Sequence, residues 1–448
     1  MRLHFIAIGG SAMHNLALAM HKAGHSISGS DDEIFEPSHS RLKAEGLLPP
    51  EAGWFPEKIT AELDQVILGM HARPDNPELK KAHELGLPVL SYPEFLYQRS
   101  SEKTRVVIAG SHGKTTITAM ILHILHFHNE EADFMVGAQL KGFDTMVRTG
   151  SKSEFMLLEG DEYLSSPEDH RPKFLHYHPN IALLSGIAWD HINVFPNFES
   201  YRAQFTKFVD SIEPGGALVY NAEDPLVQEV VNQSKNEIKR FPYTLPDYEV
   251  REGQYYLNTD EGEIPLLIKG RHNMNNLEGA RWICNQMGIT NEQFYEAIGS
   301  FEGASLRMEP LREDEQLKVY RDYAHAPSKV KASLEALREA YPHFEIIGCL
   351  ELHTFSSLNS SFIPHYRESM QAADRALVYF NPKVLAHKRL PPLEPAMIQE
   401  AFQHPHLTVV TTKDELLAKL PKAKGPAAYL LMSSGNFDGI NWRDYWLS

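Results

Sequence analysis

The chain has 448 residues, of which 42% are hydrophobic and 23% charged, a globular composition long enough for about three domains. Its net charge of −16 (43 Lys and Arg, 59 Asp and Glu) argues against nucleic acid or a basic membrane-binding face as its main partner. The two cysteines, Cys284 and Cys349, form no disulfide framework, and no run approaches about 18 apolar residues, so we expect a cytoplasmic protein.

The start of the chain predicts a nucleotide-binding βαβ unit. Residues 3–9 and 26–30 are typical of strands, with a helix over 15–23 between them. The residues expected to face a ligand are Gly9, Gly10, Ser11, Ala12, Met13 and, after the second strand, Asp31. The dinucleotide fingerprint is degraded, because its first and third glycines fall on Ala7 and Ala12. A NAD-dependent oxidoreductase is weakly supported, a nucleotide held by its diphosphate fits at least as well, and a turn without a ligand stays open.

Two further predicted strands, residues 66–69 and 87–90, complete this first domain. The first of them leads into His71 and a turn-rich segment. The polar stretch 98–103 is a natural linker, so we place the end of the domain at residue 102.

The stretch that follows predicts a phosphate-binding loop. Residues 105–109 are a β-branched apolar strand, and residues 117–125 are typical of a helix. The loop between them consists of Gly110, Ser111, His112, Gly113, Lys114, Thr115 and Thr116. Backbone N–H groups and Lys114 would hold phosphates there, and the Thr115 hydroxyl would bind magnesium. The pattern is shorter than the common one, with Ile108 at its first glycine, and a solvated lysine after a glycine turn is the alternative.

Two polar clusters follow the next predicted strands. Residues 155–158 end in Glu159-Gly160-Asp161-Glu162, and residues 181–185 lead to Trp189-Asp190-His191. Because ligands collect at the carboxyl edge of a parallel sheet, Glu159 and His191 are candidate ligands of divalent cations. A solvated acidic turn is the more ordinary fate of such a cluster.

The second half of the chain predicts polar hairpins over 243–264 and then a third domain of alternating strands and helices. Asn273 and Asn276 open a helix, where amides cap the helix or bind a purine edge. Arg307 lies in a boundary segment, 303–311, and Asp322 ends the next strand. The further predicted strands, residues 345–350, 376–379, 408–410 and 428–432, alternate with helices, which indicates a mostly parallel sheet.

These stretches, taken in order, resemble the Mur ligase family, ATP-dependent enzymes that add amino acids or peptides to UDP-N-acetylmuramic acid. The resemblance covers the whole chain and rests on AGSHGKTT, EGDE, the Trp-Asp-His triplet, GRHNMNN, Arg307 and DYAHAP. It implies three α/β domains: a Rossmann-like UDP-sugar domain (1–102), a P-loop ATPase domain with a mostly parallel sheet (103–302) and a Rossmann-like amino-substrate domain (303–448).

The resemblance also implies acyl-phosphate chemistry with ATP and Mg²⁺, and a role for each matching residue. ATP would be held by Gly110, Ser111, Gly113, Lys114, Thr115, Thr116, Asn273, Asn276, Arg307 and Asp322, and metal by Thr115, Glu159 and His191. Lys114, His112, Glu159 and His191 would be catalytic. The UDP part would lie at Gly9 to Met13, Asp31 and His71. The expected partners are UDP-N-acetylmuramate and an amino substrate, without nucleic acid or membrane, in a monomer or weak homo-oligomer.

Within the family, the chain is more similar to the peptidoglycan-recycling branch, which uses the tripeptide L-alanyl-γ-D-glutamyl-meso-diaminopimelate, than to the branch that adds L-alanine. The similarity rests on residues 69–77, 173–177 and 432–437. The chain also departs from the family pattern, since it has Leu306-Arg307 where the alanine branch has paired arginines. Phe205 occupies the place of a metal-bridging carbamylated lysine, with Lys207 out of register, which argues against a carbamate. The alternatives are the L-alanine ligase, a non-catalytic nucleotide-binding regulator and a Rossmann oxidoreductase.

Overall fold

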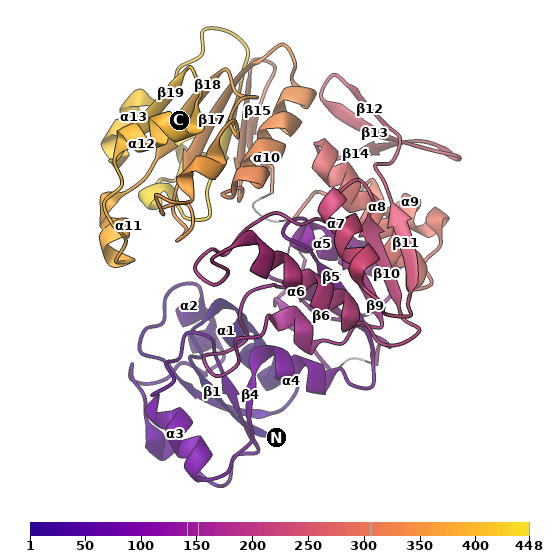
Figure 1. Cartoon of the computed structure of the whole chain (residues 1–448), viewed down its shortest axis with the longest axis vertical. Helices are drawn as coiled ribbons and strands as arrows, with labels where there is room; N and C mark the ends of the chain where they lie inside the picture. Colours follow the sequence, from indigo (N-terminus) through magenta and orange to yellow (C-terminus); the bar gives the residue numbers. More distant parts are fainter. Residues whose placement is uncertain (141, 151, 305–306, 448) are drawn as a thin grey trace. The chain divides into compact units, whose positions relative to one another are not determined.

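The computed structural model describes residues 1–140, 142–150, 152–304 and 307–447, so Leu306 lies outside the described residues. The backbone groups into two compact units, whose elements are labelled in Figure 1. The first unit comprises Met1–Ile187, Arg202–Tyr243 and Gly279–Thr290, and the second comprises Ala188–Tyr201, Thr244–Glu278 and Asn291–Ser448.

The first unit begins with a parallel sheet in the order β2-β1-β3-β4, which confirms the βαβ start. Its elements are β1 (Arg2–Ile6), α1 (Ser11–Lys22), β2 (Ser26–Ser30), α2 (Ser38–Ala44), η1 (Pro56–Lys58), β3 (Gln65–Leu68), α3 (Pro77–Glu84), β4 (Val89–Ser91) and α4 (Tyr92–Arg99). Helices α3 and α4, for which the sequence analysis had no prediction, have clear start signals. The Asn76 side chain caps α3, and Ser91 and Glu94 form a capping box on α4.

The first unit also contains the sheet that carries the predicted phosphate loop. Its elements are β5 (Thr104–Ala109), α5 (Lys114–Phe127), β6 (Asp133–Met135), β7 (Val147–Arg148), β8 (Phe155–Gly160), η2 (Lys173–His176), β9 (Ile181–Leu184), α6 (Phe198–Asp210), β10 (Ala217–Asn221), α7 (Pro225–Gln233) and β11 (Lys239–Tyr243). The order is β11-β10-β9-β5-β8-β6-β7, and every pair except β6 with β7 is parallel. The carboxyl ends of β9, β5 and β8 therefore lie side by side.

The second unit contains the predicted hairpins and the second βα sheet. Its elements are β12 (Tyr248–Arg251), β13 (Gln254–Thr259), β14 (Gly262–Leu266), α8 (Arg271–Gln286, shared with the first unit), α9 (Asn291–Ile298), β15 (Glu309–Glu313), β16 (Leu317–Asp322), α10 (Pro327–Ala340), β17 (Glu345–Glu351), η3 (Ile363–Tyr366), β18 (Arg375–Tyr379), α11 (Pro382–His387), α12 (Pro395–Phe402), β19 (Leu407–Val410), α13 (Lys413–Lys419), β20 (Ala427–Met432), η4 (Phe437–Gly439) and α14 (Trp442–Leu447). The sheet order is β15-β16-β20-β17-β18-β19, parallel except for β15. Helix α10 packs on β17 and β20, and α13 packs on β19 (Figure 1).

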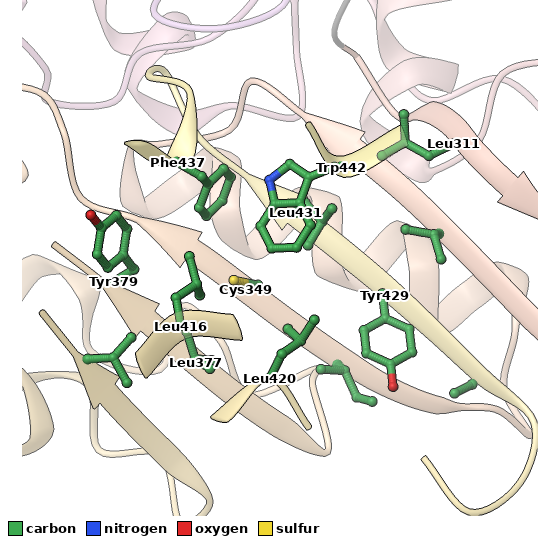
Figure 2. Close-up of a cluster of buried hydrophobic side chains, with 14 residues drawn as sticks. Leu311, Cys349, Leu377, Tyr379, Leu416, Leu420, Tyr429, Leu431, Phe437 and Trp442 are labelled. Carbon is green, nitrogen blue, oxygen red and sulfur yellow. The ribbon is translucent and has the colours of Figure 1, made fainter. Parts of the chain in front are cut away.

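Alternate residues of the central strands build the core on one face of this sheet. Cys349, Leu377 and Leu431 project from three neighbouring strands, beside Phe437 and Trp442 (Figure 2). The rings of Phe437 and Trp442 meet edge to face at 5.4 Å. This packing fixes the last strand, β20, and the turn that follows it. Both cysteines are buried free thiols, as the sequence indicated.

Candidate active site

The predicted phosphate loop connects the end of β5 to the start of α5, as the sequence indicated. Gly110 and Gly113 have φ angles of 130° and 82°, which favour glycine over other residues. A Cβ on Gly110 would lie 2.2 Å from the Ser185 hydroxyl oxygen, so glycine is also needed for space. The loop is tied to the end of β9, because the Ser111 N–H donates to the Gly186 carbonyl at 2.9 Å. Backbone N–H groups at the start of a 14-residue helix suit a phosphate.

Lys114 is charged and held at the mouth of this loop. Its Nζ donates to Glu162 Oε2 at 2.7 Å and to the Gly110 carbonyl at 2.6 Å. Burial by itself lowers the pKa of Lys114, but the carboxylates of Glu162, Asp161 and Glu159 outweigh it, so the pKa of Lys114 is raised above its ordinary value. The acidic cluster is therefore not a solvated turn.

Thr115 and Glu159 form the pair of oxygen donors expected for a magnesium site. The Thr115 hydroxyl donates to Glu159 Oε1 at 2.7 Å, and the Gly137 N–H donates to Oε2 at 2.6 Å. Both side chains are buried, with Glu159 only 7% exposed. A hydroxyl at the start of α5 and a carboxylate at the end of β8 are hard oxygen ligands, so the residues present fit Mg²⁺.

The other loop residues are packed rather than exposed. Ser111 and Thr116 are buried. The His112 ring lies against Gly186, since a Cβ there would be 2.3 Å from His112 Cε1. Phe205, at the place of the family's bridging lysine, is fully buried and packs edge to face on Phe174 at 5.6 Å. Lys207 is exposed.

The N-terminal turn keeps the geometry of a nucleotide-binding loop in spite of its degraded fingerprint. Ala7 takes φ 67°, a glycine-like conformation at the position of the missing first glycine. The Gly9 N–H donates to Asp31 Oδ2 at 2.7 Å, so the two predicted residues are in contact. Burial raises the pKa of Asp31 to about 6. Ser11, Ala12 and Met13 lie in the first turn of α1, with the Met13 side chain in the core, whereas His71 is exposed.

The Trp-Asp-His triplet belongs to the second unit, where Asp190 lies next to Lys329 and is influenced by His325, two residues of the DYAHAPSK segment. Asp190 Oδ2 lies 3.5 Å from Lys329 Nζ, and Oδ1 accepts from the backbone N–H of His191 at 2.8 Å. Burial alone would raise the pKa of Asp190, but Lys329, His191 and His325 reverse this, and its pKa lies far below the usual range. Burial and Lys329 in turn lower the pKa of His325 to about 4.

Asp322, Arg307 and the two asparagines also lie in this second unit. Asp322 is buried and accepts the N–H groups of Met308 and Ala324 at 2.8 and 2.7 Å, which shapes the backbone next to Arg307. The Arg307 guanidinium lies over the Tyr323 ring at 5.0 Å. Within α8, the Asn273 amide donates to the Lys269 carbonyl, and Asn276 donates to Asn273. Both asparagines lie within α8 and contact each other.

The charged partners of the candidate site residues could not be identified from the sequence. Glu162 was seen only as part of an acidic cluster and His325 only as part of a motif, and Lys329 was not identified. Glu94, Asp169 and His176 form another cluster, with ligand atoms within 4.8 Å of one another. Arg171 holds Asp169 there through Nε–Oδ contacts of 3.0 Å, so a cation is already in place and we assign no metal to this cluster.

Family models match nearly the whole chain: "Mur ligase family, catalytic domain" at residues 2–104, "Mur ligase middle domain" at 108–284 and "Mur ligase, glutamate ligase domain" at 306–435. A curated UDP-N-acetylmuramate–L-alanine ligase from Caldicellulosiruptor bescii is 31% identical over 387 residues, 84% of this chain and 82% of the relative. The chain belongs to the Mur ligase family. The three-domain α/β fold class predicted from the sequence is thereby confirmed, whereas the domain boundaries at 102 and 302 stay predictions.

Among solved structures, a murein peptide ligase from Psychrobacter arcticus matches with a TM-score of 0.69 and 22% identity, over 99% of this chain and 98% of that one. The UDP-N-acetylmuramate:L-alanyl-γ-D-glutamyl-meso-diaminopimelate ligase from Neisseria meningitidis matches with a TM-score of 0.61 and 25% identity, over 67% of this chain and 98% of that one. Mur ligases are ATP-dependent enzymes that form amide bonds and use Mg²⁺, so the chain is an enzyme of this class. None of its described helices combines the length and apolar content needed to cross a bilayer.

Proposed function

We propose that this enzyme joins the carboxylate of UDP-N-acetylmuramate to an amine, at the expense of ATP, through an acyl phosphate. The observation that carries the proposal is the loop in which Lys114 meets Glu162 and the Thr115 hydroxyl meets Glu159. A carboxylate is a poor electrophile, and transfer of a phosphoryl group to it creates a leaving group. Catalysis of that step rests on position and charge, which this loop supplies.

Each residue of the phosphate loop has a defined part in this proposal. Lys114 and the N–H groups of Gly110 and Gly113 hold the phosphates, with Ser111 in the same loop and Thr116 in the first turn of the helix. Thr115 and Glu159 hold Mg²⁺, which neutralises charge on the phosphates when bound. His112 stabilises the acyl phosphate or the intermediate that follows.

The remaining candidates form three groups. Asn273 and Asn276 bind adenine, and Arg307 and Asp322 bind ATP. His191 is the second metal ligand. Gly9, Gly10, Ser11, Ala12, Met13, Asp31 and His71 bind the UDP part. All of these roles come from the family resemblance and from the local geometry described above.

The comparisons support L-alanine as the amino substrate better than the tripeptide that the sequence analysis favoured. Curated relatives at about 30% identity, including the one from C. bescii, are named L-alanine ligases. We therefore propose L-alanine first. The tripeptide is the second candidate, because Arg307 stands alone where the alanine branch has paired arginines and because the N. meningitidis structure is a tripeptide ligase.

The test is phosphate release from ATP with Mg²⁺ and UDP-N-acetylmuramate, with L-alanine or the tripeptide added. Release with one amine, and a product of the summed mass, identifies the amino substrate. The matched control is Lys114→Met, which should release no phosphate with either amine. If the wild-type chain releases none with either, the ligase proposal fails and a nucleotide-binding regulator becomes the better description.

A further inference from the structure

A second polar cluster lies at the carboxyl edge of the C-terminal sheet and has no role in the function proposed so far. Glu351 is the last residue of β17, and the neighbouring strand β20 ends at Met432, one residue before Ser433. His353 follows two residues after Glu351. Small ligands of parallel α/β sheets bind at this edge.

The Glu351 carboxylate is buried, and its two oxygens have different surroundings. Oε2 accepts the Phe437 N–H at 2.8 Å and the hydroxyl of Ser433. Oε1 lies 3.8 Å from His353 Nδ1. The Glu351 side chain is 5% exposed, whereas the His353 side chain is 37% exposed. The carboxylate is therefore fixed by the turn after β20, and the imidazole lies between it and solvent.

The turn after β20 is fitted closely to this pair. A Cβ on Gly435 would lie 2.8 Å from His353 Nδ1 and 2.9 Å from Glu351 Oε2. The Gly435 N–H also donates to the Ser433 hydroxyl oxygen at 2.7 Å. Because Glu351 and the turn cover the Nδ1 side of the ring, Nε2 is the nitrogen left for a ligand.

A buried carboxylate next to one imidazole nitrogen favours the tautomer with a proton on that nitrogen. The other nitrogen then carries a lone pair, and the carboxylate stabilises the imidazolium that forms when it takes a proton. This arrangement suits a general base. The separation of 3.8 Å is long for a hydrogen bond, as is common in catalytic pairs before substrate binds.

We infer that His353 Nε2 is the base that deprotonates the amino substrate, with Glu351 as its positioning residue. The inference rests on the proposed function, because an amine reaches the enzyme as an ammonium ion near neutral pH and cannot attack until it loses a proton. Nε2 takes that proton. The amine lone pair then forms the C–N bond, the C–O bond to phosphate breaks, and the second amine proton leaves with the phosphate.

The test compares two nucleophiles in the same assay, the amino substrate and hydroxylamine. Hydroxylamine is neutral at pH 7 and traps an acyl phosphate as a hydroxamate without a base. In His353→Gln we expect amide formation at pH 7 to fall about 10²–10³-fold and to recover partly at pH 9, while hydroxamate formation stays within about threefold of the wild type. The matched control is His343→Gln, an exposed histidine of the same unit, which should change neither rate.

Glu351→Gln tests whether Glu351 positions His353 or only stabilises the turn after β20. Glutamine can still accept the Phe437 N–H, so we expect hydroxamate formation to persist, while amide formation becomes slower and its pH profile shifts to lower pH because the imidazolium has lost the carboxylate that stabilised it. The inference is overturned if His353→Gln forms amide within threefold of the wild type, or if its hydroxamate rate falls as far as its amide rate. If the wild-type chain gives neither product, the proposed function itself fails.

Discussion

Replacing Lys114 by methionine removes the ammonium group that donates to Glu162 Oε2 at 2.7 Å. The Glu162 side chain is 1% exposed and that of Lys114 is 14% exposed, so the pair is largely buried. Breaking a buried ion pair from one side costs about 3–5 kcal/mol, because the carboxylate stays buried and loses the cation that offsets its desolvation. We expect Lys114→Met to lose stability by about that amount and to release no phosphate.

A second substitution distinguishes the structural part of this loss from the catalytic part. In Lys114→Met/Glu162→Gln the uncompensated charge is gone, so stability should return to within about 1–2 kcal/mol of the wild type while the enzyme stays inactive. The loss of stability in Lys114→Met should also be smaller at low pH, where the carboxylates around the removed lysine can take up a proton.

Urea unfolding at pH 7 and pH 5.5, followed by circular dichroism, measures these differences, and phosphate release measures activity. The reasoning is refuted if the double variant is as unstable as Lys114→Met. It is refuted equally if the single variant stays within about 1 kcal/mol of the wild type, because the pair would then contribute no more than an exposed one.

Three further outcomes test other parts of the structure. Gly110→Ala should cost at least about 2 kcal/mol in urea unfolding, from its φ of 130° and the overlap with Ser185, and adding Ser185→Ala should restore part of the loss. Leu431→Ala should cost about 2–5 kcal/mol, whereas Leu267→Ala, at a side chain 54% exposed, should stay within about 0.5 kcal/mol; equal losses would contradict the packing in Figure 2. The folded chain lowers the pKa of His325 from its ordinary 6.5 to about 4. The stability that neutral His325 contributes to the folded chain is therefore present above pH 6.5 and is lost as the pH falls toward 4. His325→Asn should therefore flatten the stability profile in that window, by up to about 3 kcal/mol, and an unchanged profile would refute this.

The sequence was most informative where chemistry depends on neighbours along the chain. The apolar strand 105–109, the glycine turn and Lys114 predicted the phosphate loop, because a strand, a turn and a helix in succession admit few backbone paths. The periodicity of hydrophobic residues and the residue composition likewise predicted the main parallel strands of the sheets. Helix α4 was missed although a capping box, Ser91 with Glu94, and a proline in the first turn, Pro93, mark its start.

The partners of the site residues were not readable from the sequence, because they come from distant segments. Lys114 meets Glu162, 48 positions away, and Asp190 meets Lys329, 139 positions away. Such pairs depend on strand order, and the register that puts Glu159 beside Ile108 appears only in the folded sheet. The need for glycine at positions 110 and 435 was hidden for the same reason. At each position the space for a Cβ is taken by a side chain from the end of another strand.

The contact between Gly9 and Asp31 has a consequence for calorimetry. A carboxyl group with a pKa of about 6 is partly protonated near neutral pH, and an anionic ligand bound to the adjacent turn would favour its protonated form. Binding of such a ligand would then take up a fraction of a proton from the buffer. The measured heat of binding would change with the ionisation enthalpy of the buffer, and the affinity would rise as the pH falls through about 6.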